Sequence, residues 1–263
     1  MKIGIIGIGI VGGAVKYGME KLGHTVSFYD PAYNSKWESI LDTDLIFICV
    51  PTPSTQDGSC DINIVSATLE RLKDSSYGGT VAIKSTVVPG TTERLAKDVP
   101  FSLAFVPEFL RERCATNDFV ENHDLCVIGT EDSDTFLKIV EAHGRYPKNF
   151  VQLTPTEAEF VKYFNNVYNA TLITFANSMY EVCNSLGVDY SKVKDAVVNR
   201  EHITDIYLDC NENFRGFGGV CLPKDTKALD YLAKQHGLNV DFFDMLIKEN
   251  NKYKTTVFEG MRL

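Results

Sequence analysis

One glycine-rich segment, residues 216–225 (GFGGVCLPKD), gathers the residue types best suited to covalent chemistry. Its glycines free the backbone to pass close to a ligand. Pro223 suits the first turn of a helix, which places Cys221 at or just before a helix N-terminus. The helix dipole, the N–H groups there and the charge of Lys224 favour a thiolate. Asp225 falls four residues after the cysteine, near the same helix face, so the segment predicts a nucleophile with a carboxylate beside it.

A second glycine-rich segment lies near the N-terminus, between an apolar strand over residues 2–6 and a predicted helix that runs to about residue 22. A G-x-G-x-x-G sequence in that context predicts a dinucleotide-binding (Rossmann) loop. Its predicted cofactor-binding residues are Gly7, Gly9, Val11 and Gly12. Asp30 ends the next predicted strand, 25–29, at a spacing typical of ribose hydroxyl recognition. Because a carboxylate repels a 2′-phosphate, the sequence favours NAD over NADP.

The elements that must position these residues alternate between strand and helix in the first part of the chain. Apolar runs predict strands over residues 45–50, 80–84, 102–106 and 125–129, and helical patterns cover 61–73 and 133–143. This alternation predicts an α/β fold with a doubly wound parallel sheet. Ligands of such sheets bind beyond the carboxyl ends of the strands. The predicted strand ends carry Asp30, Pro51, Thr86 and the pair Pro107-Glu108.

The pattern changes near residue 154, and we predict an α-helical domain from there on. A long central helix is expected from Thr156 to about Leu186, with Thr156 and Glu159 as a capping box. Further helices are expected over residues 189–198, 225–236 and 241–258. The predicted domains are therefore 1–154, which binds NAD, and 155–263, which carries the cysteine segment. A symmetric partner would cover the apolar residues of the long helix, so we expect a homodimer. These apolar residues are Phe160, Phe164, Leu172 and Phe175.

Composition limits the classes of function. The net charge of −9 argues against nucleic acid as a partner. No apolar run approaches the roughly 20 residues of a membrane span, and the N-terminus does not have the pattern of a signal peptide. Seven cysteines without a Cys-x-x-Cys pair, and five scattered histidines, predict a reduced cytoplasmic protein without a metal site.

The cysteine segment resembles the signature of the nucleotide-sugar dehydrogenases, the UDP-glucose 6-dehydrogenase family: GFGG, one residue, Cys, an apolar residue, Pro, Lys, Asp. Residues 107–112 (PEFLRE) are similar to a second motif of this family, which has Asn or Ser before the proline and Gly after the second glutamate, where this chain has Val106 and Arg113. Glu108 and Glu112 would share one face of a helical turn. Lys162 and Asn166, four residues apart, match a Lys-x-x-x-Asn pair in the family's long helix. Two other stretches depart from the family: residues 211–215, and Ser178 after Asn177, where members often carry Asn-Glu.

The resemblance implies the four-electron oxidation of UDP-glucose to UDP-glucuronate with two NAD molecules, through a Cys221 thiohemiacetal and thioester. The catalytic residues it implies are Cys221, Lys162, Asn166, Asp225, Glu108 and Thr86. Beyond the glycine loop and Asp30, the cofactor-binding residues it implies are Thr86, Glu112 and Lys224. The substrate-binding residues it implies are Glu108, Phe109, Leu110, Arg111, Glu112, Lys162, Asn166, Asn211, Phe214 and Gly218.

Two alternatives stay open at this point. A β-hydroxyacid dehydrogenase shares the dinucleotide domain and a Lys-x-x-x-Asn pair, but it performs a two-electron oxidation and needs no cysteine. The third reading is a non-catalytic NAD-binding dimeric module. Members of the resembled family continue into a third domain that closes over the nucleotide, and nothing in this sequence corresponds to it; a naturally short form, a truncated chain and a surface supplied by another subunit are equally open readings.

Overall fold

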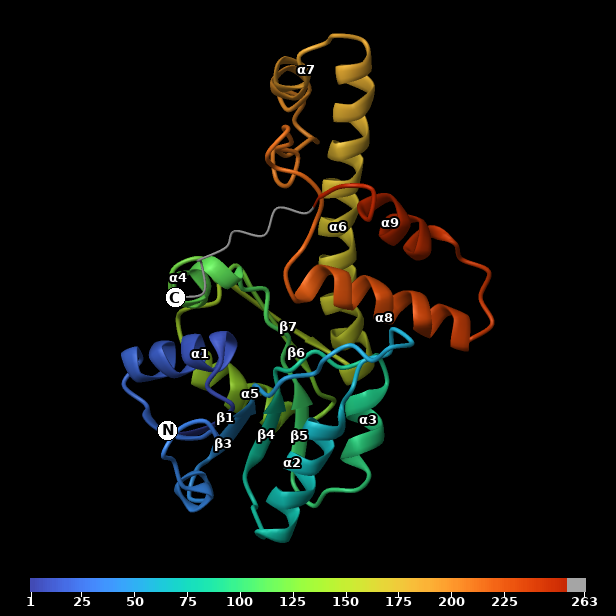
Figure 1. Ribbon diagram of the computed structural model, residues 1–263. Coiled ribbons are helices and arrows are strands. Elements are labelled where there is room, and N and C mark those ends of the chain that lie inside the picture. The colour runs from blue at the N-terminus through green and yellow to red at the C-terminus, as the bar shows by residue number, and fades with distance from the viewer. Residues whose placement is uncertain (255–263) are drawn as a thin grey trace. The chain divides into compact units, whose positions relative to one another are not determined.

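The computed structural model describes residues 1–254, and the chain divides into two compact units (Figure 1). The first unit comprises Met1–Pro53 and Cys60–Lys162. The second comprises Ser54–Ser59 and Tyr163–Leu263, of which the structure describes the residues up to 254.

The described strands of the first unit form one seven-stranded sheet in the order β2-β1-β3-β4-β5-β6-β7. The strands are β1 (Lys2–Ile6), β2 (Thr25–Tyr29), β3 (Leu45–Ile48), β4 (Thr80–Ile83), β5 (Ser102–Phe105), β6 (Leu125–Gly129) and β7 (Asn149–Leu153). Every residue of β3 and β4 is buried, as expected for central strands with helices on both faces. This confirms the predicted α/β class.

Two apolar cores lie on the two faces of the sheet. One packs α1 (Ile10–Lys21), α4 (Ala115–Val120) and α5 (Ser133–His143) against the strands. The other packs α2 (Asn63–Asp74), α3 (Thr91–Ala96) and the first turns of α6 (Pro155–Ser185) against them. The 3₁₀ turns η1 (Trp37–Ile40) and η2 (Glu112–Cys114) lie in connections. The winding of helices around both faces is visible in Figure 1.

The sheet is not purely parallel, which corrects the sequence prediction. Strands β1 to β5 are parallel, but β6 runs antiparallel to β5, with Phe105 opposite Gly129, and β7 is parallel to β6. The connection from β5 to β6 contains only the short α4 and the turn η2. An antiparallel connection starts and ends at the same edge of the sheet, whereas a parallel crossover must cross the sheet to the opposite edge. The chain therefore enters β6 from the edge at which it left β5.

The second unit is helical and contains most of α6, with α7 (Tyr190–Val197), α8 (Cys221–Gln235) and α9 (Phe242–Asn250). A small core of Ala176, Cys183, Tyr190, Leu208 and Cys210 joins α6 to α7 and the segment after it. Helix α8 begins at Cys221, four residues before its predicted start. The helix predicted over 241–258 ends at Asn250, and residues 255–258 of it lie outside the described residues.

The N-terminal cap of α6 differs from the predicted pair of Thr156 and Glu159. Glu157 accepts hydrogen bonds from the backbone N–H and the hydroxyl of Thr154, both at 2.9 Å, so the capping box stands two residues earlier. Glu159 is fully buried and accepts from the backbone N–H groups of Gly90 and Thr92, at 2.6 and 2.8 Å. That glutamate therefore joins α6 to the start of α3.

Candidate active site

The carboxyl edge of the parallel strands collects the predicted residues of the first unit. Because β1 to β5 are parallel, their carboxyl ends share one edge of the sheet. Gly7 follows β1, Asp30 follows β2, Thr86 lies after β4 and Glu108 lies after β5. The strand order places β1 between β2 and β3, the switch point at which open α/β sheets bind nucleotides.

Two glycines of the dinucleotide loop are required by close backbone approach. Gly7 has φ +90°, and a Cβ there would lie 2.6 Å from the carbonyl oxygen of Cys49. A Cβ on Gly12 would lie 1.9 Å from the carbonyl oxygen of Gly7. A Cβ on Gly9, the residue before α1, would meet nothing within 4 Å. The loop thus packs tightly on the protein side and leaves the start of α1 open, which fits a bound pyrophosphate.

Asp30 closes this loop from the neighbouring strand. One oxygen of its carboxylate accepts the backbone N–H of Ile8 at 2.6 Å, and the other accepts that of Ala32 at 2.8 Å. Two backbone donors hold the carboxylate in place beside the glycine loop. This position suits an acceptor for ribose hydroxyls, the role predicted from the sequence.

Lys162 and Glu108 form a buried ion pair within the first unit. The Lys162 Nζ atom donates to a Glu108 carboxylate oxygen at 2.9 Å and to the Glu108 carbonyl oxygen at 2.6 Å. Burial raises the pKa of Glu108, but the charge and hydrogen bond of Lys162 and the N–H of Leu110 outweigh burial and hold this pKa below its ordinary value. Glu108 is therefore an ionised carboxylate with a cation in contact.

A second buried lysine, which the sequence analysis did not select, supports the same strand end. The Lys84 side chain is 4% exposed, and its Nζ donates to the carbonyl oxygen of Val106 at 3.2 Å. Burial lowers the pKa of Lys84, partly offset by the charge of Glu108. A lysine that directly follows the apolar run Val81-Ala82-Ile83 was the sequence signal that could have marked it.

The segment after β5 corrects the predicted helical turn over residues 107–112. Residues 106–111 form no helix, and Glu112 begins the 3₁₀ turn η2. The carboxylate of Glu108 accepts the N–H of Leu110 at 2.7 Å, which folds the chain locally in a non-helical turn. The two glutamates do not share a helical face.

Arg111 is held by an acidic residue that the sequence reasoning missed. Its Nε and backbone N both donate to one oxygen of Asp118 at 2.9 Å, and its Nη2 donates to the other at 2.6 Å. The side-chain hydrogen bond from Arg111 lowers the pKa of the buried Asp118 carboxyl well below its usual range. The role of Asp118 follows only from the fold, because nothing in the sequence distinguishes it from other acidic residues.

In the second unit, α8 carries the predicted nucleophile and its carboxylate. Cys221 is the first residue of α8 and is exposed, and Asp225, one turn later, is fully buried. Asn166 Nδ2 donates to Asp225 Oδ2 at 2.6 Å, and Lys224 Nζ lies 2.5 Å from Asp225 Oδ1. The buried carboxylate thus contacts an amide from α6 and a cation from its own helix.

The segment before Cys221 folds as a turn. Asn211 and Phe214 form an isolated antiparallel bridge, and the side chain of Asn211 accepts the N–H of Asn213 at 2.9 Å. The Phe214 side chain is partly exposed, whereas Phe217 is buried. In the first unit, two further selected residues are partly buried. Leu110 packs against one core of the sheet, and Phe109 packs against the other.

The structure thus arranges the selected residues in two groups. Lys162 and Glu108 are paired in the first unit, and Asn166 and Asp225 are paired in the second, on the helix that begins with Cys221. Lys162 and Asn166 lie one turn apart on α6.

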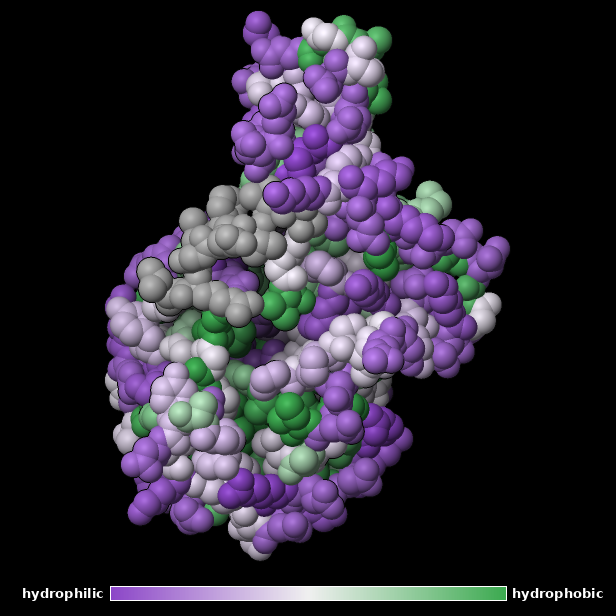
Figure 2. Space-filling model, viewed as in Figure 1, coloured by the Kyte–Doolittle hydropathy of each residue, from purple (hydrophilic) through white to green (hydrophobic). Residues whose placement is uncertain are grey.

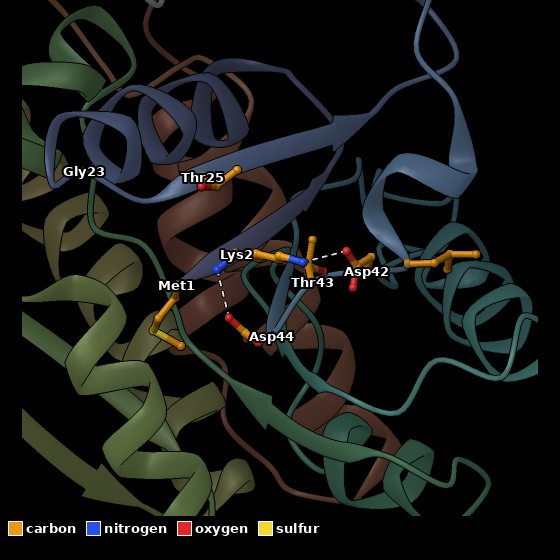
Figure 3. A pocket seen from close by; sticks show the side chains of 8 residues that line it. Met1, Lys2, Gly23, Thr25, Asp42, Thr43 and Asp44 are labelled. Atoms are coloured by element: carbon orange, nitrogen blue, oxygen red, sulfur yellow. Dashed lines mark hydrogen bonds and ion pairs between the residues drawn. The ribbon is translucent and has the colours of Figure 1, made fainter.

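A pocket lies at the opposite edge of the sheet from the dinucleotide loop. It has a volume of about 420 Å³ and is lined by Met1, Lys2, Gly23, Thr25, Leu41, Asp42, Thr43 and Asp44. Figure 3 shows the Lys2 Nζ directed at Asp42, at 2.6 Å, and the Lys2 backbone N–H at Asp44, at 2.8 Å. Because it is at the amino ends of β1 and β2, this pocket is not where a parallel sheet binds its cofactor.

A glycine loop at the switch point of a mainly parallel sheet, followed by a helical region with a long helix, defines a dinucleotide-dependent dehydrogenase. The sequence matches the NAD-binding domain of the UDP-glucose/GDP-mannose dehydrogenase family over residues 31–145 and the central domain of the same family over residues 156–252. The chain belongs to this family, and its first unit is an NAD-binding domain.

Individual relatives agree with the family. The chain is 33% identical to a UDP-glucose 6-dehydrogenase of Haloferax volcanii and 31% identical to a GDP-mannose 6-dehydrogenase of Pseudomonas aeruginosa, over 86% and 84% of this chain. These matches cover 56% and 54% of the relatives, so the chain spans about half the length of the curated relatives it matches. A solved UDP-glucose dehydrogenase from Pyrobaculum islandicum superposes with a TM-score of 0.87 at 31% identity, covering 95% of this chain and 68% of that one.

A 3-hydroxyisobutyrate dehydrogenase of Mycobacterium tuberculosis, at 13% identity and a TM-score of 0.73, shares the fold. Among residues 1–254, no helix has both the length and the apolar character needed to cross a membrane.

Proposed function

We propose that this chain oxidises the CH₂OH group of a nucleotide-sugar, UDP-glucose in the first instance, to a carboxylate with two molecules of NAD. The observation that carries the proposal is the start of α8, where an exposed Cys221 stands one turn before Asp225, and Asp225 is buried and bonded to Asn166. Relatives named for UDP-glucose and for GDP-mannose are similarly close in sequence, so the choice of sugar rests on experiment.

The first oxidation removes a proton and a hydride from the alcohol. NAD supplies the hydride acceptor for both oxidations. A cation beside the alcohol oxygen stabilises the developing alkoxide, and Lys162, whose charge is held in place by Glu108, can supply it. A water held by Asp225 can accept the proton, and Asn166, which donates to Asp225, can orient that carboxylate. The product of this step is an aldehyde.

The second oxidation requires the nucleophile. The Cys221 thiolate adds to the aldehyde carbon and forms a thiohemiacetal, which keeps the aldehyde bound. Loss of the hydroxyl proton and of a second hydride gives a thioester, and hydrolysis releases the carboxylate and regenerates the thiol. The balance is one alcohol, two NAD⁺ and one water to one carboxylate, two NADH and three protons. Glu108 or Asp225 would activate the water of hydrolysis.

The long helix supports a homodimer in this proposal. Exposed apolar residues follow one another along α6 at intervals of three, four and seven, which places them on one helix face. They are Phe160, Phe164, Tyr168, Phe175, Met179 and Val182, with Leu186 directly after the last residue of the helix. Figure 2 shows hydrophobic residues, in green, at the end of α6. Leu172 packs instead against the core of its own unit, so the apolar face differs in that residue from the sequence prediction.

The decisive measurement is the number of NADH molecules formed per sugar. We expect two with UDP-glucose, and for Cys221→Ser we expect loss of the second oxidation, because serine is a far weaker nucleophile at neutral pH. GDP-mannose serves as the second substrate arm. One NADH per substrate for the unaltered protein would favour a simple hydroxyacid dehydrogenase, and none with any nucleotide-sugar would favour a non-catalytic NAD-binding module. Two NADH from Cys221→Ser would refute covalent catalysis.

A further inference from the structure

The side chain of Asn250, the last residue of α9, pairs with both backbone groups of Phe217. Phe217 N–H donates to Asn250 Oδ1 at 2.7 Å, and Asn250 Nδ2 donates to the Phe217 carbonyl oxygen at 2.9 Å. Both residues are buried, so neither backbone group has water as an alternative partner. Two opposed hydrogen bonds fix the position and the direction of the Phe217 backbone, as a neighbouring strand would.

Phe217 lies between glycines that would otherwise leave the chain free. Gly216 and Gly219 have φ values of +59° and +73°, in the region that favours glycine. Such a segment has many conformations of similar energy, and a specific contact is needed to select one of them. Phe217 stands four residues before Cys221, the first residue of α8. A contact that fixes Phe217 therefore limits where α8 begins and where its cysteine stands.

A second buried amide holds the residues just before Phe217. Asn177, on α6, accepts the N–H of Gly216 at 3.1 Å and the Nε of Arg215 at 2.8 Å on its Oδ1, and its Nδ2 donates to Ile173 O at 2.8 Å. Asn177 is 1% exposed. Two asparagines thus attach the glycine segment to two helices. This contact explains the structural role of Asn177, which could not be predicted from its sequence context.

We propose that Asn250 is a positioning residue for Cys221: its amide fixes the backbone at Phe217 and so sets the start of α8. Asn177 provides the second attachment. The inference deepens the proposed function, on which the catalytic part of it rests, but the effect on the backbone is independent of turnover. Asn250 touches no group that the proposed reaction changes.

Hydrogen exchange measured by mass spectrometry tests the effect on the backbone. In Asn250→Leu, the peptide that contains Phe217 should exchange faster by about tenfold or more, because its amide loses a buried acceptor. Asn250→Asp keeps the shape of the side chain but replaces the donor with a carboxylate oxygen that faces the Phe217 carbonyl. The peptide that contains Phe217 should therefore also exchange faster in this variant. Asn251→Leu is the matched control, because Asn251 is the exposed neighbour, and its exchange should match that of the unaltered protein. Unchanged exchange in both Asn250 variants would overturn the proposal.

Labelling of Cys221 by iodoacetamide, followed by peptide mapping, tests the effect on the nucleophile without turnover. A frayed first turn of α8 no longer favours the thiolate, so we expect labelling of Cys221 to slow by about threefold or more in both Asn250 variants. The rate at Cys114, in the other unit, should be unchanged. Equal or faster labelling of Cys221 would contradict a positioning role.

Steady-state kinetics separates this inference from the proposed function. We expect kcat to fall by about tenfold in the Asn250 variants while KM for NAD stays within about twofold, because the cofactor domain is unaltered. An unchanged kcat would refute the role in catalysis. If exchange and labelling respond as expected but Cys221→Ser still yields two NADH, the asparagine contact stands and covalent catalysis fails.

Discussion

Asn166 Nδ2 donates a 2.6 Å hydrogen bond to the carboxylate of Asp225, and both side chains are buried. This contact joins α6 to α8 inside the second unit. It explains how a carboxylate one turn after the exposed Cys221 can be fully buried: its two oxygens are paired with an amide and with the cation of Lys224. The sequence motif Lys-x-x-x-Asn thus has a structural use at its asparagine that is separate from that of Lys162.

Replacing Asn166 by leucine should weaken the protein and stop its reaction. The buried Asp225 carboxylate loses a hydrogen-bond donor, which costs about 1–3 kcal/mol of unfolding free energy. We expect kcat to fall by about 100-fold or more if Asn166 also acts on the substrate. Urea denaturation and NADH formation measure the two effects. Asn184→Leu, an exposed asparagine on the same helix, is the control and should change neither.

The Lys162–Glu108 pair predicts a non-additive stability cycle. Lys162→Met leaves Glu108 buried without its cation and should cost about 3–5 kcal/mol of unfolding free energy. Adding Glu108→Gln removes the unpaired charge, so the double variant should recover a large part of that loss. If Lys162 stabilises the alkoxide, Lys162→Met should lose turnover, and the double variant should not regain it. Additive losses in urea denaturation would show that the pair is not coupled.

Two histidines of the first unit, the buried His143 and the half-buried His123 that contacts it, predict acid sensitivity. Burial lowers the pKa of His123 to about 4 and that of His143 well below its ordinary value of 6.5. The folded protein then binds fewer protons than the unfolded chain, so stability is lost as the pH falls from about 6.5 toward 4, by up to about 1.4 kcal/mol per pH unit for each histidine. His143→Phe should make this loss less steep in pH-dependent urea denaturation. His202→Phe, at an exposed position, should leave the slope as it is.

The spacing of apolar residues and the positions of glycines and polar residues were sufficient to predict the elements around the cofactor loop. The apolar runs that became β1 to β4 are bounded by glycines and polar residues, and the loop between β1 and α1 has glycines where a Cβ would collide with backbone. The reversed direction of β6 was not predictable in the same way. It depends on how the chain packs between Phe105 and Leu125. Strand β6 (LCVIG) has the continuous apolar run that is typical of a buried parallel strand, although it is antiparallel to β5.

Contacts between distant residues account for the parts of the site that the sequence did not predict. By its spacing, Glu159 could form a capping box with Thr156, but in the structure it accepts hydrogen bonds from the backbone of Gly90 and Thr92. Thr154 and Glu157 form the cap instead. The contact of Asn250 could not be predicted either, because its partner Phe217 is 33 residues away in the sequence. Local spacing contains no information on such pairs, whereas the Cys221 segment is chemically informative by itself.

Asp30 predicts the cofactor preference. Asp30→Ala should weaken NAD binding by about 10- to 100-fold, because an acceptor for the ribose hydroxyls and a support of the Ile8 N–H are both lost. Binding of NADP should not weaken, because the repulsion of its 2′-phosphate is removed. Titration calorimetry with both cofactors measures the change. Asp42→Ala, at the opposite edge of the sheet, is the control; an equal loss there would mean that the effect is general destabilisation.

The apolar face of α6 predicts the oligomeric state. Phe164, Phe175 and Leu186 are 76%, 57% and 73% exposed, which is a large apolar area to leave in water. Across a two-fold axis each substitution occurs twice, so Phe175→Glu places two charges at the same interface. Burial of one phenylalanine is worth about 1.5–3 kcal/mol, and losing two should shift the dissociation constant by about 100-fold or more. Light scattering at micromolar concentration should therefore give a dimer for the unaltered protein and a monomer for Phe175→Glu. Ile206→Glu, at an exposed apolar position outside α6, should remain a dimer. A monomeric unaltered protein would refute this use of the helix, and a dimer that survives Phe175→Glu would assign the contact to another surface.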